Sequence, residues 1–309
     1  MTALATAEAP ILVSGANGFT GRFVCQELRR RSIPFIALLR PGRDACWLAS
    51  QQIPVRFANL NNPIELAAAL QGCRALLNVA SIGFGAVPSI LQACAAVGVN
   101  RAVFVSTTAI FTQLNAGSKA VRLAAEADIQ ASALDWTILR PTMIYGTPAD
   151  RNMIRLIQWL NRWPFLPVFG KGRSLQQPVC VTDVAWAVVE VLDQSATYRR
   201  AFNLSGASPL TYNEVVQLVA ASLGREVSLL HLPASLAIRI LRLTERLGLK
   251  LPIKAEQIQR LNEDKAFDHQ EASDVFGFSP IAFPQGIEHE VNLFRAGADG
   301  LSVTSDLRS

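Results

Sequence analysis

The segment GANGFTG, residues 15–21, decides the fold of this 309-residue chain. It follows a short apolar run at 11–15 and overlaps the segment 19–31, where apolar residues recur at helical spacing and arginines gather at the end. Strand, glycine turn and helix in this order begin a βαβ unit. The first glycine permits a tight exit from the strand, the second lets a ligand approach the backbone, and the third lets the helix pack closely on the sheet.

The same turn predicts an anion site. Free N–H groups at the start of the helix, together with the helix dipole, favour a negatively charged group there. A three-glycine pattern alone is a weak signal and also fits an ordinary turn. Between a buried strand and an amphipathic helix, however, Gly15, Gly18 and Gly21 indicate a dinucleotide whose pyrophosphate rests on the turn.

Strand and helix patterns alternate through the first half of the chain. Near-continuous apolar runs indicate buried strands, and amphipathic segments between them indicate helices. We therefore predict an α/β fold of the Rossmann type, a doubly wound parallel sheet covered by helices on both faces. Further strands are expected at 34–40, 54–60, 75–81, 101–107 and 136–146, with helices at 63–71, 87–97 and 118–131.

The sequence pattern changes after Gly146, where a Trp- and Arg-rich helix is followed by a loop that contains several Pro and Gly residues. We predict an NAD(P)-binding Rossmann domain, a smaller C-terminal α/β substrate domain that includes a helix over 233–247, and a flexible tail. The Rossmann domain is expected at 1–146 with parts of 178–206, the substrate domain at 147–177 and 207–295, and the tail at 296–309.

The end of the second expected strand bears on the choice of dinucleotide. An acidic residue there would bond the ribose hydroxyls of NAD. The strand instead runs into LLRPGR at 38–43, with no carboxylate before Asp44. Arg40 and Arg43 suit a bidentate contact with a 2′-phosphate, so NADP(H) is favoured over NAD(H). Two solvated loop arginines are the alternative.

Composition argues against several other classes of protein. A net charge of +5 without long basic runs does not favour nucleic acid as a partner. The five cysteines and three histidines lack the spacing of metal ligands, so no metal is expected, and the thiols are predicted to be buried and reduced. Because no long apolar run and no signal-peptide pattern occur, we expect a cytoplasmic protein without a membrane span.

Beyond the glycine turn, a series of short motifs resembles the extended or atypical short-chain dehydrogenase/reductase superfamily, in its NAD-dependent epimerase/dehydratase branch. They fall in order and are GANGFTG (15–21), NVAS (78–81), VFVSTTAIF (103–111), SK (118–119), LRPTMIYG (139–146), PVCVTDVA (178–185) and FNLSG (202–206). The resemblance implies a Rossmann domain plus a smaller substrate domain, and an enzyme that uses a nicotinamide dinucleotide.

The resemblance also implies roles for individual residues. Those implied to contact the cofactor are Asn17, Phe19, Thr20, Asn59, Leu60, Asn78, Val79, Ala80, Ser81, Pro141 and Ile144. Ser106 and Thr107 fall where the family keeps a hydroxyl that bonds the reacting oxygen of the substrate. Lys119 matches the lysine that holds the nicotinamide ribose and lowers the pKa of a catalytic tyrosine.

One position departs from the family motif YxxxK. Four residues before Lys119 stands Asn115, which is expected at the substrate but cannot exchange a proton as a phenol does. Lys119 itself, as in reductases of the isoflavone-reductase type, or Tyr145 would then supply the proton. Glu126 is on the same helical face as Lys119 and able to pair with it; for Glu126 and Arg122 a surface ion-pair ladder is the alternative to a ligand contact.

The segment 150–180 is the expected substrate contact. Its cations suit a phosphorylated small molecule, and FGKGRSLQQPV at 169–179 resembles the loop that reaches the substrate diphosphate in sugar-nucleotide enzymes. The cations concerned are Arg151, Arg155, Lys171 and Arg173. Ordinary solvated loop charges are the alternative.

The sequence therefore predicts an NADP(H)-dependent oxidoreductase or epimerase-like enzyme that acts on a nucleotide sugar or a similar carbonyl or alcohol substrate. An isoflavone-reductase-like NADPH reductase is the second enzymatic hypothesis. Because the motif tyrosine is missing, a non-catalytic NAD(P)H-binding sensor or assembly protein is the alternative from another class. A homodimer is expected at the level of the family.

Overall fold

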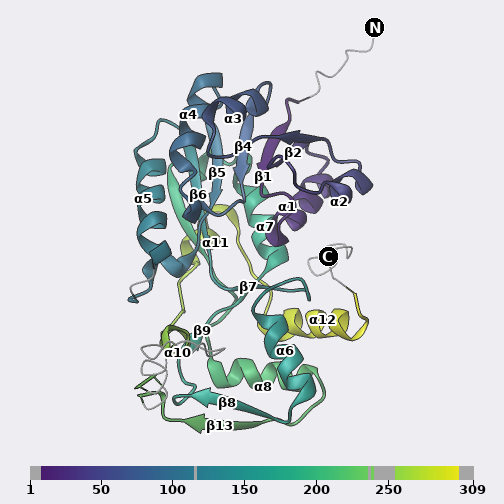
Figure 1. Cartoon of the computed structure of the whole chain (residues 1–309), viewed down its shortest axis with the longest axis vertical. Coiled ribbons are helices and arrows are strands. Elements are labelled where there is room, and N and C mark those ends of the chain that lie inside the picture. The colour runs from purple at the N-terminus through teal and green to yellow at the C-terminus, as the bar shows by residue number, and fades with distance from the viewer. Residues whose placement is uncertain (1–7, 115–116, 236–237, 240–254, 299–309) are drawn as a thin grey trace.

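The computed structural model describes residues 8–114, 117–235, 238–239 and 255–298 (Figure 1). Its centre is a seven-stranded parallel sheet in the order β11-β6-β5-β4-β1-β2-β3, so the predicted doubly wound α/β class is confirmed. The strand order reverses between β1 and β4, which is where such sheets bind ligands. The strands are β1 (Ile11–Ser14), β2 (Phe35–Leu39), β3 (Val55–Phe57), β4 (Ala75–Asn78), β5 (Arg101–Val105), β6 (Asp135–Pro141) and β11 (Arg200–Leu204).

Helices cover both faces of this sheet (Figure 1). On one face α1 (Phe19–Arg30) packs on α7 (Val181–Glu190), and both contribute to a first hydrophobic core. On the other face α3 (Pro63–Leu70), α4 (Val87–Val97) and α5 (Gly117–Ala131) enclose a second core. The two layers bury the sheet on both sides, which explains the near-continuous apolar strands of the sequence.

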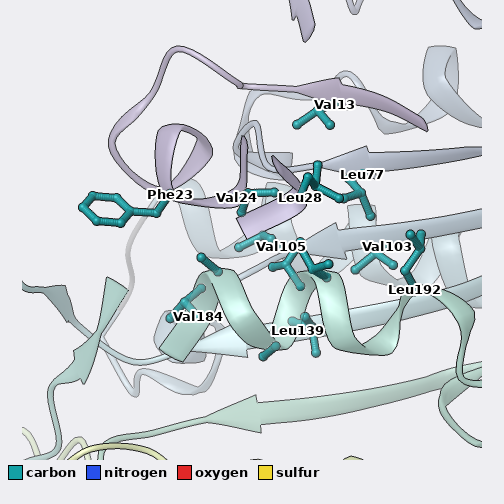
Figure 2. Close-up of a cluster of buried hydrophobic side chains, with 14 of the residues drawn as sticks. Val13, Phe23, Val24, Leu28, Leu77, Val103, Val105, Leu139, Val184 and Leu192 are labelled. Atoms are coloured by element: carbon teal, nitrogen blue, oxygen red, sulfur yellow. The ribbon is translucent and has the colours of Figure 1, made fainter. Parts of the chain in front are cut away.

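Successive residues of each central strand point into different cores. Ile11 and Val13 of β1 belong to the first core, whereas Leu12 between them belongs to the second. The neighbouring strand repeats the pattern, with Leu77 in the first core and Leu76 in the second. Figure 2 shows the first core, in which side chains of the strands meet those of α1 and α7.

A smaller unit lies at the carboxyl end of the sheet and has a third core of its own (Figure 1). It contains helices and a parallel pair of strands, β8 with β13. Its elements are α6 (Met153–Arg162), β8 (Phe165–Phe169), α8 (Tyr212–Ser222), β13 (Ser228–Leu232), α10 (Ala255–Leu261) and α12 (Phe283–Arg295). The remaining elements are α2 (Cys46–Ser50), β7 (Ile144–Tyr145), β9 (Leu175–Gln176), β10 (Val179–Cys180), β12 (Leu210–Thr211), α11 (Gln270–Phe276), η1 (Ile82–Phe84), η2 (Thr108–Phe111), η3 (Val191–Asp193) and η4 (Ser195–Thr197).

The strand expected at 136–146 is in fact two strands. β6 ends at Pro141, and the Thr142 hydroxyl donates to the carbonyl of Gln177, which bends the chain away from the main sheet. β7 then pairs with β10 instead of a strand of the sheet. The helix predicted over 233–247 and the tail at 296–309 lie mainly outside the described residues.

Leu77 offers a direct test of the first core. Its side chain is 0% exposed, so Leu77→Ala removes buried methyl groups and leaves a cavity, and we expect a loss of about 2–5 kcal/mol in the free energy of unfolding. Leu123→Ala is the matched control on α5, because Leu123 is 44% exposed and its truncation is expected to change stability by less than about 0.5 kcal/mol. Urea denaturation measures both; equal losses would contradict the assigned core.

Candidate functional site

A cavity of about 1140 Å³ runs along the carboxyl ends of the central strands and into the smaller unit. Loops that follow all of β1 to β6 contribute to its wall, as expected for a ligand site at the switch point of a doubly wound sheet. The smaller unit contributes residues 150–152, Gln176 and the segment 260–267. A pocket of this size accommodates a dinucleotide together with a small molecule.

The glycine turn forms part of the cavity wall. Gly15 has φ +71°, and a Cβ on Gly21 would lie 2.0 Å from the Gly15 carbonyl oxygen, so neither glycine tolerates a side chain. Gly18 is the N-cap of α1 and provides no side-chain cap, and its amide donates back to Gly15 at 2.9 Å. The first N–H groups of α1 at Phe19 and Thr20 therefore remain available to an anion. All of Gly15, Asn17, Gly18, Phe19, Thr20 and Gly21 line the cavity.

The nucleotide end of the cavity is basic. Arg40 and Arg43 line it, and the Arg43 amide donates to the Arg40 carbonyl to close the turn after β2. Asp44 points elsewhere, because its carboxylate accepts the Cys46 amide at 2.8 Å. The predicted adenine contacts Asn59 and Leu60 also line this end. Cations, rather than a carboxylate, thus line the cavity after β2.

The loop after β4 lines the cavity through Val79, Ala80 and Ser81, as the sequence predicts. Asn78 lies beneath them instead. Its side chain is buried, accepts the Ser14 hydroxyl at 2.7 Å and donates to the Ala80 carbonyl at 3.0 Å. Asn78 therefore supports the loop from below and is not among the described residues of the wall.

The expected hydroxyl contacts at the end of β5 separate into two roles. Ser106 is buried, donates to Glu126 at 2.5 Å and is not among the described residues of the cavity wall, so its contact with the reacting oxygen stays a prediction. Glu126 is also buried and pairs with Arg140 at 2.6 Å; it is neither part of a surface ladder nor a partner of Lys119. Thr107, Thr108 and Ala109, which follow Ser106, line the cavity.

Lys119 lies at the start of α5, where it donates to the carbonyl of Thr112. The described wall includes Ser118 and Arg122 from this helix, but not Lys119. Arg122 is held by the Ser118 hydroxyl at 2.9 Å. Asn115 lies outside the described residues, so the missing tyrosine position has no structural account. The contact of Lys119 with a nicotinamide ribose stays a prediction.

Tyr145 is fully buried in the third core and is not among the described residues of the cavity wall, so its role as a proton donor stays a prediction. Its ring packs on Phe283 at 5.1 Å between centroids, and a Cβ on Gly286 would lie 2.2 Å from its hydroxyl. Burial raises the pKa of the Tyr145 phenol well above its ordinary value. After β6, Thr142, Met143 and Ile144 line the cavity, whereas the described wall does not include Pro141.

Of the four cations expected at the substrate, only Arg151 lines the cavity. Arg155, Lys171 and Arg173 are exposed to solvent and lie outside the described wall. The cavity receives other cations that no motif indicated, because Arg260 reaches it from the last turn of α10 and Lys265 from the segment after this helix. That segment carries no sequence pattern that marks a site, so only the tertiary fold reveals it.

A buried pair of carboxyl groups lies under the wall. Asp150 lines the cavity and caps α6, accepting the amides of Asn152 at 2.7 Å and Ile154 at 3.2 Å. Its other oxygen is buried toward Glu290 of α12, which accepts the Gly146 amide at 2.8 Å. Burial, and then the charge of Asp150, raise the pKa of Glu290 to about 10. Glu290 therefore holds a proton near neutral pH.

Three further observations concern possible metal ligands, membrane-spanning helices and the cysteines. Groups of three or more metal-ligating side chains do not occur among the described residues. Within the same ranges, none of the helices is both long and apolar enough to cross a membrane. Cys25, Cys73, Cys94 and Cys180 are buried free thiols, but Cys46 is exposed, which corrects the expectation that all five would be buried.

Comparison with known proteins agrees with this geometry. A family model described as NAD(P)H-binding matches residues 15–195, and the chain belongs to this family. The chain is 24% identical over 333 residues to the 2-alkyl-3-oxoalkanoate reductase of Shewanella oneidensis, covering 91% of this chain and 85% of that protein. It is also 24% identical over 227 residues to the mitochondrial NADH dehydrogenase [ubiquinone] 1 alpha subcomplex subunit 9 of Arabidopsis thaliana, covering 67% of this chain but only 56% of the relative.

Solved structures of the same fold belong to the epimerase and dehydratase group. UDP-glucose 4-epimerase from Thermotoga maritima superposes with a TM-score of 0.73 at 15% identity, covering 93% of this chain and 99% of the other. UDP-N-acetylglucosamine 4-epimerase from Bacillus cereus gives 0.71 at 17% identity, with the same coverage of 93% and 99%. The chain thus belongs to the NAD(P)H-binding family and shares the fold of these epimerases, and its named relatives include a reductase.

The Glu290 proton makes stability depend on pH. Because the folded pKa lies above the ordinary value of 4.5, the folded state holds one proton more than the unfolded state between pH 4.5 and about 10. The contribution is therefore fully present below pH 4.5 and is lost as pH rises, with a slope that approaches about 1.4 kcal/mol per pH unit. Glu290→Gln is expected to flatten the fall in unfolding free energy between pH 6 and 9.

The control is Glu288→Gln, whose carboxyl lies in solvent on the same helix. Guanidinium denaturation at both pH values measures all three proteins. If Glu290→Gln and Glu288→Gln both gave the same pH profile as the wild type, the assignment of a raised pKa to Glu290 would be contradicted.

Proposed function

We propose that this protein is an NADPH-dependent oxidoreductase that reduces a carbonyl compound. The observation that carries the proposal is a single cavity, which is lined by the glycine turn, by Arg40 and Arg43, by Thr107 and by residues of the smaller unit. Bound NADPH would supply a hydride at the Thr107 end. The named reductase relative supports a reductive reaction.

The residues present fit the cofactor. The unoccupied N–H groups at the start of α1 suit its pyrophosphate, and the glycines leave the space that a Cβ would fill. Arg40 and Arg43 suit the 2′-phosphate. Thr107 accepts the Ala109 amide at 3.2 Å through its hydroxyl oxygen, so its O–H is left to donate to a substrate carbonyl and hold it in place.

A nucleotide sugar is the second candidate substrate. Arg151 and Arg260 line the end of the cavity away from the glycine turn and suit a diphosphate. The Thermotoga maritima epimerase of the same fold is described with UDP-glucose. A non-catalytic role as a cofactor-binding subunit is the alternative suggested by the NADH dehydrogenase relative. The cytoplasmic location and a homodimer stay predictions.

Cofactor preference tests the nucleotide end of the site. We expect NADPH to bind at least about tenfold more tightly than NADH, because a charge-assisted bond to a phosphate is worth roughly 1.5–3 kcal/mol. Arg40→Gln and Arg43→Gln are each expected to weaken NADPH by about ten- to a hundredfold and NADH by less than about threefold. Isothermal titration calorimetry measures all of these affinities.

Arg173→Gln serves as the control, since Arg173 is exposed and lies outside the described wall. It is expected to bind both dinucleotides as the wild type does. Equal affinities for NADPH and NADH, unchanged by Arg40→Gln or Arg43→Gln, would contradict the assignment to NADP(H).

Turnover tests the reaction. Oxidation of NADPH at 340 nm is followed with simple ketones, quinones and UDP-sugars, for the wild type and Thr107→Val. Loss of the Thr107 hydroxyl is expected to reduce kcat by about ten- to a hundredfold at unchanged NADPH affinity, because Val keeps the shape of Thr but cannot donate. Tight NADPH binding without turnover of any acceptor would favour the non-catalytic alternative.

A further inference from the structure

The segment after α10 forms a wall of the cavity that no motif predicted. Two of its carboxylates hold it in place: Glu263 accepts the Thr112 hydroxyl at 2.6 Å, and Asp264 accepts the Leu175 amide at 2.8 Å. The backbone amide of Lys265 donates to the Leu175 carbonyl at 2.7 Å. Because Thr112 follows β5 and η2, these bonds fix Lys265 on the side of the cavity that also contains the loop after Thr107.

Lys265 is placed as a proton donor would be. It lines the cavity and is partly buried, and no hydrogen bond of its ammonium group is recorded within the described ranges. Burial lowers the pKa of the Lys265 amine, helped by the positive charge of Arg260 and opposed by Glu263. Asp264, the remaining charged group of the segment, is occupied by its bond to the strand β9. An amine shifted toward neutrality exchanges protons more readily in general acid catalysis.

Two aromatic rings flank the same part of the wall. Phe111 and Phe267 both line the cavity, with ring centroids 5.6 Å apart and planes inclined by 34°. Phe111 is 42% exposed even though it is a large apolar side chain, and Arg140 lies over its ring at 5.4 Å. Apolar rings left open in a cavity favour a flat, apolar ligand, since such a ligand stacks on them and removes them from water.

We propose that Phe111, Phe267 and Lys265 form the substrate subsite, that it takes a planar apolar carbonyl compound such as an aromatic ketone, and that the Lys265 ammonium protonates the carbonyl oxygen. This inference rests on the proposed reductase function. In the balanced reduction the carbonyl carbon accepts a hydride from the proposed NADPH, the C=O π bond opens, and the oxygen takes the Lys265 proton. The ketone becomes a secondary alcohol, the dinucleotide is oxidised, and the neutral amine regains a proton from water.

The first experiment needs no cofactor. The chain has five lysines, so reductive methylation with ¹³C-formaldehyde gives a simple spectrum in which Lys265→Arg identifies the Lys265 signal. We expect that signal to titrate at a pH below the ordinary lysine value of 10.5. Acetophenone is expected to shift the Lys265 signal but not that of Lys171, and cyclohexyl methyl ketone, which has the same carbonyl on a non-planar ring, to shift it less.

The second experiment uses turnover. With acetophenone, Lys265→Met is expected to lower kcat by at least about a hundredfold, in line with the loss of a general acid. Lys265→Arg keeps the positive charge but cannot release a proton at neutral pH, so kcat is expected to fall while KM stays within about threefold. Phe111→Leu is expected to raise KM about three- to tenfold for acetophenone and less for cyclohexyl methyl ketone. Lys171→Met, exposed and outside the described wall, is the control.

The outcomes separate the subsite from the proposed function. Wild-type turnover that survives Lys265→Met, with an unchanged pH profile, overturns the role of Lys265 and leaves the reductase function standing. Absence of NADPH turnover with every carbonyl overturns the reductase function and the proton transfer with it. A Lys265 signal that titrates at 10.5 and does not respond to acetophenone overturns the subsite whatever the turnover. Binding of UDP-glucose that shifts the Lys265 signal while acetophenone does not would replace the planar ketone by a nucleotide sugar.

Discussion

The close approach of α1 to the end of β1 is the contact on which the rest of the structure depends. The Gly15 carbonyl lies where a side chain on residue 21 would be, 2.0 Å from that Cβ position, so only glycine lets the helix start this near the strand. The approach directs the first N–H groups of α1 into the cavity. It also brings Phe23, Val24 and Leu28 onto the first core, so the same contact builds the fold and one end of the site.

The other end of the site depends on buried polar contacts rather than on local sequence. Glu126 ties together Ser106 of the β5 end and Arg140 of β6, which fixes the two strand ends that border the cavity. Glu263 ties the smaller unit to the loop after β5 through Thr112. These contacts join the two units on the sides of one cavity. Ser106 and Glu126 are occupied by these bonds, whereas Thr107 and Lys265 line the cavity.

The sequence predicts the fold well because its signals are local. A strand, a glycine turn and a helix are adjacent in the chain, and the apolar runs of β4 and β5 record burial on both faces. The cofactor residues of the turn follow from the same pattern. The choice between Ser106 and Thr107 depends on which way each side chain points at the end of a strand, and a resemblance of motifs does not fix that direction.

The sequence indicates less about the substrate end of the site than about the fold, for a physical reason. Tyr145 is followed by a glycine turn beside the expected site, but packing of α12 buries its ring in the third core. Arg155, Lys171 and Arg173 are near Arg151 in sequence, yet helix and loop geometry turn them to solvent. Lys265 is far away in sequence and reaches the cavity only through the bridge to β9. Contacts between distant segments leave no periodic trace in a single sequence.

The most direct test of the account is a crystal structure of the protein with NADPH. We predict that the pyrophosphate lies on the N–H groups of Phe19 and Thr20, that Arg40 or Arg43 contacts the 2′-phosphate within about 3 Å, and that the nicotinamide ring lies beside Thr107. A dinucleotide bound in the reverse direction, or with its 2′-phosphate in solvent and its nicotinamide away from Thr107, would contradict the account.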